Sequence, residues 1–128
     1  MAASIPPIDL IVCDDNHIMR DLLGSVLEGY GLRVVGAASA VALDSLLAER
    51  HINLVLLDVG LPDEDGLSVA ARLRLAHPNL GLVMLTARSE PKDRDRALAN
   101  GADFYFVKPF DTAELAAALI GLHGRRSG

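Results

Sequence analysis

Hydrophobic residues form five short runs along the chain, and glycine, proline or charged residues bound each run. Runs of four to six Val, Ile and Leu residues are typical of buried strands. The predicted strands cover residues 8–13, 32–37, 53–58, 80–85 and 103–107. Between them, hydrophobic residues recur every three or four positions, as along one face of a helix. Strand and helix therefore alternate five times.

This alternation predicts an α/β fold, a doubly wound parallel sheet with helices on both faces and right-handed crossovers. The signals at the helix ends agree with it. Ser39 can cap the second helix, and Asp111 with Glu114 resembles a capping box before the fifth. Gly31 and Gly101 stand where helices should stop.

The length of 128 residues predicts one domain with a single core. Because the chain has no Trp and only 4% aromatic residues, aliphatic side chains must fill that core. We expect a domain over residues 8–122, an N-terminal extension over 1–7, and a tail or the start of a linker over 123–128. The fourth helical segment, residues 90–100, is poorest in apolar residues and should be the least firmly packed.

Charge and composition exclude several classes of function. With a net charge of -5 and a pI near 5.2, the chain offers no basic stripe for direct contact with nucleic acid. No apolar run approaches the ~18 residues of a membrane span, and no signal peptide begins the chain, so a cytoplasmic protein is expected. The single Cys13 excludes an internal disulfide, and its apolar surroundings indicate an inert core thiol.

Polar residues follow four of the five predicted strands. Asp14 and Asp15 follow the first strand, Asp58 ends the third, Thr86 follows the fourth and Lys108 follows the fifth. Because ligands of open α/β sheets bind beyond the carboxyl ends of the strands, these side chains should meet in one crevice.

This set of residues predicts phosphoryl chemistry. Three carboxylates in one place repel by ~4 kcal/mol per pair at 4 Å, and a divalent cation removes that repulsion. Oxygen ligands with room for water suit Mg2+ or Mn2+. With the metal and Lys108 holding a phosphoryl group and Thr86 donating a hydrogen bond to it, Asp58 becomes a nucleophile that forms an aspartyl phosphate.

Each residue also has a plainer interpretation. Asp14 and Asp15 could cap the first helix, Thr86 could be an ordinary strand-end hydroxyl, and Lys108 a solvated lysine. Asp58 is harder to explain away because its flanks are apolar. The coincidence of all five at matching strand ends favours the functional interpretation.

Four segments, in this order, resemble the receiver domain of two-component response regulators: IVCDDN, VLLDVGLPDEDG, MLTAR and FYFVKPF. The resemblance extends from about Ile8 to Leu122 and implies the flavodoxin-like strand order 2-1-3-4-5. It implies that Asp58 is the phosphoacceptor, and that Mg2+ is bound by Asp58, by Asp15 directly, by Asp14 through water and by the backbone carbonyl of Gly60.

The resemblance also assigns roles to residues near the phosphoryl group. Thr86 and Lys108 would contact it, Tyr105 would reorient when Thr86 moves, and a cis peptide bond would join Lys108 to Pro109. The donor would be a histidine kinase or a phosphotransfer protein. Phosphorylation would switch the face made by the fourth helix, fifth strand and fifth helix.

Some segments, such as GLPDEDGL, resemble the branch of the family that carries winged-helix DNA-binding domains. The chain could therefore be the N-terminal part of a longer regulator or a stand-alone receiver. Many members of that branch dimerise through an acid and an arginine at the positions of Phe104 and Ala118, which are uncharged here. Gly60 and Arg88 line the entry to the site. We hypothesise that Arg88 influences how long the phosphoryl group stays on Asp58; the alternative is that Arg88 is simply a solvated arginine. His17 is expected to be an exposed residue in the first turn of the helix.

Three other functions compete with this interpretation. A haloacid-dehalogenase-like phosphatase needs a second acid two residues after its nucleophile, where this chain has Gly60. A flavodoxin-like FMN binder needs a Ser, Thr and Gly loop after the first strand, where Asp14 and Asp15 would repel phosphate. A phosphate-independent docking module stays open, although the complete set of site residues argues against it.

Overall fold

The computed structural model describes residues 7–127; of the predicted extension and tail, residues 1–6 and 128 lie outside the described residues, and the side chains of 126 and 127 are not described. The strands are β1 (Ile8–Cys13), β2 (Leu32–Ala37), β3 (Leu54–Leu57), β4 (Gly81–Thr86) and β5 (Phe104–Val107). The helices are α1 (His17–Glu28), α2 (Ala40–Glu49), α3 (Gly66–Ala76), α4 (Pro91–Ala99) and α5 (Thr112–Ser127).

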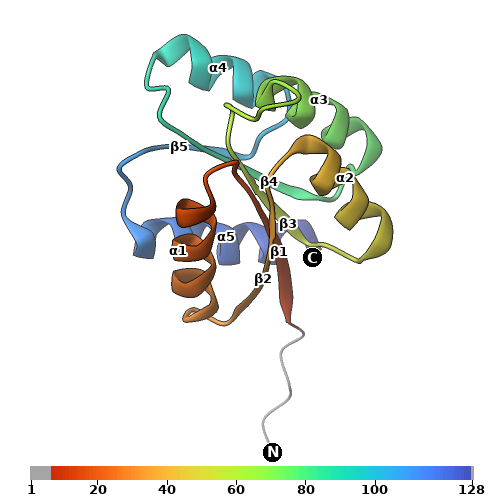
Figure 1. Ribbon diagram of the computed structural model, residues 1–128, viewed down its shortest axis with the longest axis vertical. Helices are drawn as coiled ribbons and strands as arrows, with labels where there is room; N and C mark the ends of the chain where they lie inside the picture. Colours follow the sequence, from red (N-terminus) through yellow and green to blue (C-terminus); the bar gives the residue numbers. More distant parts are fainter. Residues whose placement is uncertain (1–6, 128) are drawn as a thin grey trace, which may run out of the picture.

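The strands form one parallel sheet in the order β2-β1-β3-β4-β5, as predicted. Helices α1 and α5 cover one face of the sheet, and α2, α3 and α4 cover the other (Figure 1). The central strands are consequently buried on both sides, which explains why β3 and β4 read as unbroken hydrophobic runs.

Alternate residues of the central strands feed two separate cores. Leu54 and Leu56 of β3 pack toward α1 and α5, whereas Val55 and Leu57 pack toward α2, α3 and α4. This two-residue alternation fixes the register, because a shift by one residue would exchange the two cores. It also fixes the direction in which Asp58, the next residue, leaves the strand.

Most signals at the helix ends act as predicted. The Ser39 hydroxyl accepts a hydrogen bond from the Ala42 amide at 3.1 Å, and the Asp111 carboxylate accepts one from the Glu114 amide at 3.0 Å. Gly31 and Gly101 have φ values of 93° and 106°, which glycine adopts without strain after a helix. The hydrogen bonds of Ser39 and Asp111 fix where α2 and α5 begin.

Helix α5 includes residues 123–127, the stretch predicted as a tail or the start of a linker. The cap of α1 is Asn16, whose side chain accepts from the Ile18 and Met19 amides, and neither Asp14 nor Asp15 takes that place. Helix α4 buries only Ala97, consistent with its predicted loose packing. Over residues 7–127, no helix is long and apolar enough to cross a membrane.

Candidate functional site

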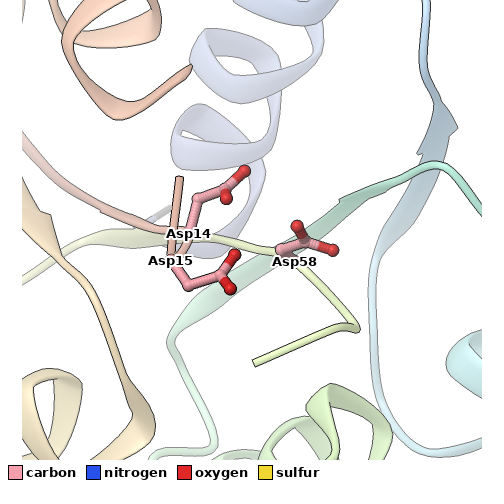
Figure 2. A group of neighbouring side chains, drawn as sticks. All are labelled: Asp14, Asp15 and Asp58. Carbon is pink, nitrogen blue, oxygen red and sulfur yellow. The ribbon is translucent and has the colours of Figure 1, made fainter. Parts of the chain in front are cut away.

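Three carboxylates gather where β1 and β3 end. These two strands are paired neighbours, so Asp14 and Asp15, which follow β1, lie beside Asp58, which follows β3. Figure 2 shows the three side chains together, and one oxygen of each lies within 4.8 Å of the others. Asp14 is buried, Asp58 is half-buried and Asp15 is exposed. The group thus opens to solvent on the side of Asp15.

Lys108 reaches this group from the end of β5. Its ammonium Nζ lies 3.1 Å from Asp14 Oδ2 and 3.4 Å from Asp58 Oδ2. The peptide bond between Lys108 and Pro109 is cis. Burial alone would lower the pKa of Lys108, but the hydrogen bond to Asp14 and the charges of Asp58 and Asp14 raise it above its usual value. The side chain is therefore a cation at neutral pH.

Asp14 and Asp58 each divide their two carboxylate oxygens between the backbone and Lys108. Asp14 Oδ1 accepts from the Asn16 amide at 2.9 Å, and Asp58 Oδ1 accepts from the Gly60 amide at 3.1 Å. Their Oδ2 atoms face Lys108. Arg20 adds a further tie, because its guanidinium donates to the backbone carbonyl of Asp14 at 2.6 Å. The local chain thereby holds both carboxylates in one orientation.

The side chains of Thr86 and Tyr105 both form hydrogen bonds with the backbone of Arg88. The Thr86 hydroxyl accepts from the Arg88 amide at 3.2 Å, and the Tyr105 hydroxyl donates to the Arg88 carbonyl at 2.8 Å. Thr86 is buried at the end of β4, and Tyr105 is half-buried on the neighbouring β5. The loop that leads from β4 to α4 is therefore attached to both residues.

The side chain of Arg88 is exposed, and so is that of His17. Cys13 is buried next to Asp14, and burial together with the neighbouring carboxylates raises its pKa to about 12, which fits an inert thiol.

The residues of the site fit a small hard cation. Three carboxylates and one ammonium leave a formal excess of two negative charges, and carboxylate oxygens are the ligands that Mg2+ and Mn2+ prefer. Over the described residues, this is the one group of three acidic, His or Cys side chains with ligand atoms this close together. Exposed Gly60 stands at its rim, with its amide on Asp58.

Two polar side chains outside the predicted set, Arg20 and Asp63, form hydrogen bonds in the segments around the site. Arg20 supports the end of β1, as described above. Asp63, in the loop after Asp58, accepts hydrogen bonds from the amides of Ala40 and Val41 in α2. No pattern along the chain pairs either residue with its partner.

Residues 10–120 match the sequence model of the response regulator receiver domain family. The chain belongs to this family. It is 38% identical over 119 residues to the virulence transcriptional regulatory protein PhoP of Salmonella typhimurium, covering 93% of this chain and 53% of that protein. The chain thus spans about half the length of the curated relatives it matches.

Solved structures agree on the fold. The signal receiver domain of an HD domain-containing protein from Pseudomonas fluorescens Pf-5 superposes with a TM-score of 0.89 at 25% identity, covering 94% of this chain and 98% of that one. A CheY-like receiver domain protein from Methanospirillum hungatei JF-1 gives a TM-score of 0.88 at 24% identity, covering 94% and 97%.

Family membership settles the class of function. The protein is a receiver domain, a signalling domain rather than a conventional enzyme. The phosphatase and FMN-binding alternatives are thereby set aside, and the fold class and the resemblance drawn from the four sequence segments are confirmed.

Proposed function

We propose that Asp58 accepts a phosphoryl group from a histidine kinase or a phosphotransfer protein, with Mg2+ or Mn2+ bound by Asp14, Asp15, Asp58 and the carbonyl of Gly60. The observation that carries the proposal is the meeting of three carboxylates with Lys108 at the carboxyl edge of the sheet. A lone carboxylate cluster would be common. One that also holds a half-buried lysine has the charges that a phosphoryl group and a cation require together.

The reaction is a nucleophilic displacement at phosphorus. A carboxylate oxygen of Asp58 forms a bond to phosphorus while the bond from phosphorus to the donor imidazole nitrogen breaks, and the electron pair leaves with that nitrogen. A bound divalent cation would neutralise charge on the phosphoryl oxygens. The Lys108 ammonium, 3.4 Å from Asp58 Oδ2, is placed to bind the negatively charged oxygens of the incoming phosphoryl group.

Thr86 and Tyr105 would convert this local event into a change of shape. The Thr86 hydroxyl accepts from the Arg88 amide, so its own proton is available for a phosphoryl oxygen. If Thr86 turns toward the phosphoryl group, the Arg88 amide loses its partner and the loop before α4 is released from one side. Because α4 buries only Ala97, it is the helix with least packing to resist movement.

We place the domain in a cytoplasmic transcriptional regulator, with the face of α4, β5 and α5 as its output surface. Support comes from PhoP, a transcriptional regulatory protein of which this chain matches about half. A homodimer through this face could not use the expected salt bridge at Phe104 and Ala118. Instead, the Arg125 guanidinium carbon lies 5.3 Å from the Phe104 ring centroid within the chain.

Intact-mass spectrometry tests the central step. The protein is incubated with acetyl phosphate in Mg2+ or in EDTA, beside Asp58→Asn. We expect one phosphate adduct that needs Mg2+ and that the variant lacks. A folded protein that takes up no phosphate under either condition contradicts the proposal and favours the phosphate-independent docking module.

A further inference from the structure

The loop that follows Asp58 is closed at its base by the backbone. The Gly66 amide donates to the Val59 carbonyl at 2.8 Å, which joins the two ends of the stretch 59–66. A Cβ atom at Gly66 would lie 2.5 Å from Val59 Cα and 2.6 Å from the Asp58 carbonyl oxygen, so only glycine fits there. Val59 is itself buried. The base of the loop therefore cannot shift without moving Asp58.

The far side of this loop is fastened to another helix. The two carboxylate oxygens of Asp63 accept from the Ala40 amide at 2.9 Å and from the Val41 amide at 3.0 Å. These are the first two residues of α2, whose amides have no partner within the helix. The α2 cap residue, Ser39, accepts from Ala42 instead. Asp63 thus completes a cap that its own helix leaves unfinished.

The charge of Asp63 suits this position. The backbone hydrogen bonds from Ala40 and Val41 hold the pKa of Asp63 below its usual value, so the carboxylate is ionised at neutral pH. A negative charge at the N-terminus of a helix also meets the positive end of the helix dipole.

A second set of contacts also links this loop to α2. Arg72 of α3 donates to Glu64 Oε1 in the loop at 2.8 Å and to Asp44 Oδ1 of α2 at 2.9 Å. All three side chains are partly exposed, so each pair is screened by solvent. Asp63 and Glu64 are adjacent in the loop, and the contacts of both connect the loop to α2.

We propose that Asp63 is a positioning residue for the metal and phosphoryl site, which anchors the 59–65 loop to α2 and so holds Gly60 beside Asp58. The inference rests on the proposed function, because it is there that Gly60 serves the cation. Coupling between two sites is reciprocal, so a cation at the aspartates must also be felt at the amides of Ala40 and Val41.

Two variants separate anchoring from stability. Asp63→Ala removes two hydrogen bonds from the start of α2, and Ser39→Ala removes one from the same turn without touching the loop. Asp63→Asn, which keeps the side-chain size and one acceptor, is a milder third variant. Thermal unfolding of each variant measures what the lost cap costs the fold.

The measurement is a titration of each protein with MgCl2, followed through backbone amide chemical shifts. For Asp63→Ala we expect a roughly tenfold weaker Mg2+ affinity, the lower end of the effect seen for direct partners of metal ligands, because Asp63 acts through the loop and contacts no proposed ligand itself. Ser39→Ala should keep the wild-type affinity even where its unfolding temperature falls as far. In wild type, Mg2+ should shift the Ala40 and Val41 amides, and in Asp63→Ala this response should be lost.

The outcomes are distinguishable. If wild type binds Mg2+ and Asp63→Ala binds it equally well, the inference is wrong and the proposed function stands. If both cap variants weaken Mg2+ binding alike, Asp63 only stabilises α2, and the inference is again wrong. A folded wild type that binds no Mg2+ overturns the proposed function, and the inference with it.

Discussion

The substitution Asp58→Asn should make the Mg2+-free protein more stable, although it removes the proposed phosphoacceptor. Asp58 has two carboxylate neighbours with oxygens within 4.8 Å and one ammonium at 3.4 Å. At an effective dielectric constant of about 20, each repulsion is about 3.5 kcal/mol and the attraction about 5 kcal/mol. The balance is a net repulsion of about 2 kcal/mol, which solvent around the exposed Asp15 reduces to about 1 kcal/mol.

Asparagine isolates the charge because it keeps the size of Asp58 and one oxygen for the Gly60 amide. For a domain of this size, about 1 kcal/mol raises the unfolding temperature by about 4 °C. Added Mg2+ should reverse the order, because a ligand present at 100 times its Kd stabilises the native state by about 2.7 kcal/mol. Wild type should gain this stabilisation, and Asp58→Asn should gain much less.

The assay is thermal unfolding of both proteins in EDTA and in a series of MgCl2 concentrations. Asp21→Asn, an exposed position on α1, is the matched control, since it makes the same change in net charge away from the three carboxylates. A higher unfolding temperature for wild type than for Asp58→Asn in EDTA would refute the reasoning. It would mean that Lys108 and the local hydrogen bonds already compensate the cluster without a cation.

Three further outcomes are expected. Gly66→Ala should destabilise the fold by about 1–3 kcal/mol by denaturant unfolding and slow phosphorylation by acetyl phosphate, because its Cβ would meet backbone at Val59 and Asp58; wild-type behaviour would show that the loop base yields. Burial raises the pKa of Cys13 from 9.0 to about 12, so between these pH values the unfolded state loses the thiol proton while the native state keeps it, and stability should fall by about 1.4 kcal/mol per pH unit. Cys13→Ala should reduce this slope in unfolding at pH 8 to 11, and equal slopes would count against the buried thiol. Arg88→Ala should change the dephosphorylation rate of the loaded protein if Arg88 shapes phosphate lifetime, and equal rates would leave it a solvated arginine.

The main site could be predicted because it depends on strand ends alone. Hydrophobic runs mark where each strand stops, and parallel strands bring all their carboxyl ends to one edge of the sheet. Asp58 and Lys108 are 50 residues apart in the chain, yet their position after β3 and β5 was enough to bring them together. Every role assigned to the site residues, from phosphoacceptor to cation ligand and switch residue, stays a prediction.

Asp63 could not be found in this way, because its partners are fixed by the path of a loop. It lies in PDED, a stretch typical of an exposed turn, and it meets an amide 23 residues earlier. The cap of α1 was also left open by the sequence, because Asp14, Asp15 and Asn16 are all residue types that cap helices. The structure places Asn16 at the cap position, directly before the first helical residue, His17.

One contact between the last turns of α5 and β5 bears both on where α5 ends and on the surface it forms with β5. Leu122 is the last buried apolar residue, so the hydrophobic pattern ends there, but Arg125 one turn later lies over the ring of Phe104. A cation over an aromatic face stabilises that turn by about 0.5–1 kcal/mol at an exposed site. The contact exists only because residue 104 is aromatic. A dimer through this face must therefore accommodate or displace Arg125 before it can reach Phe104.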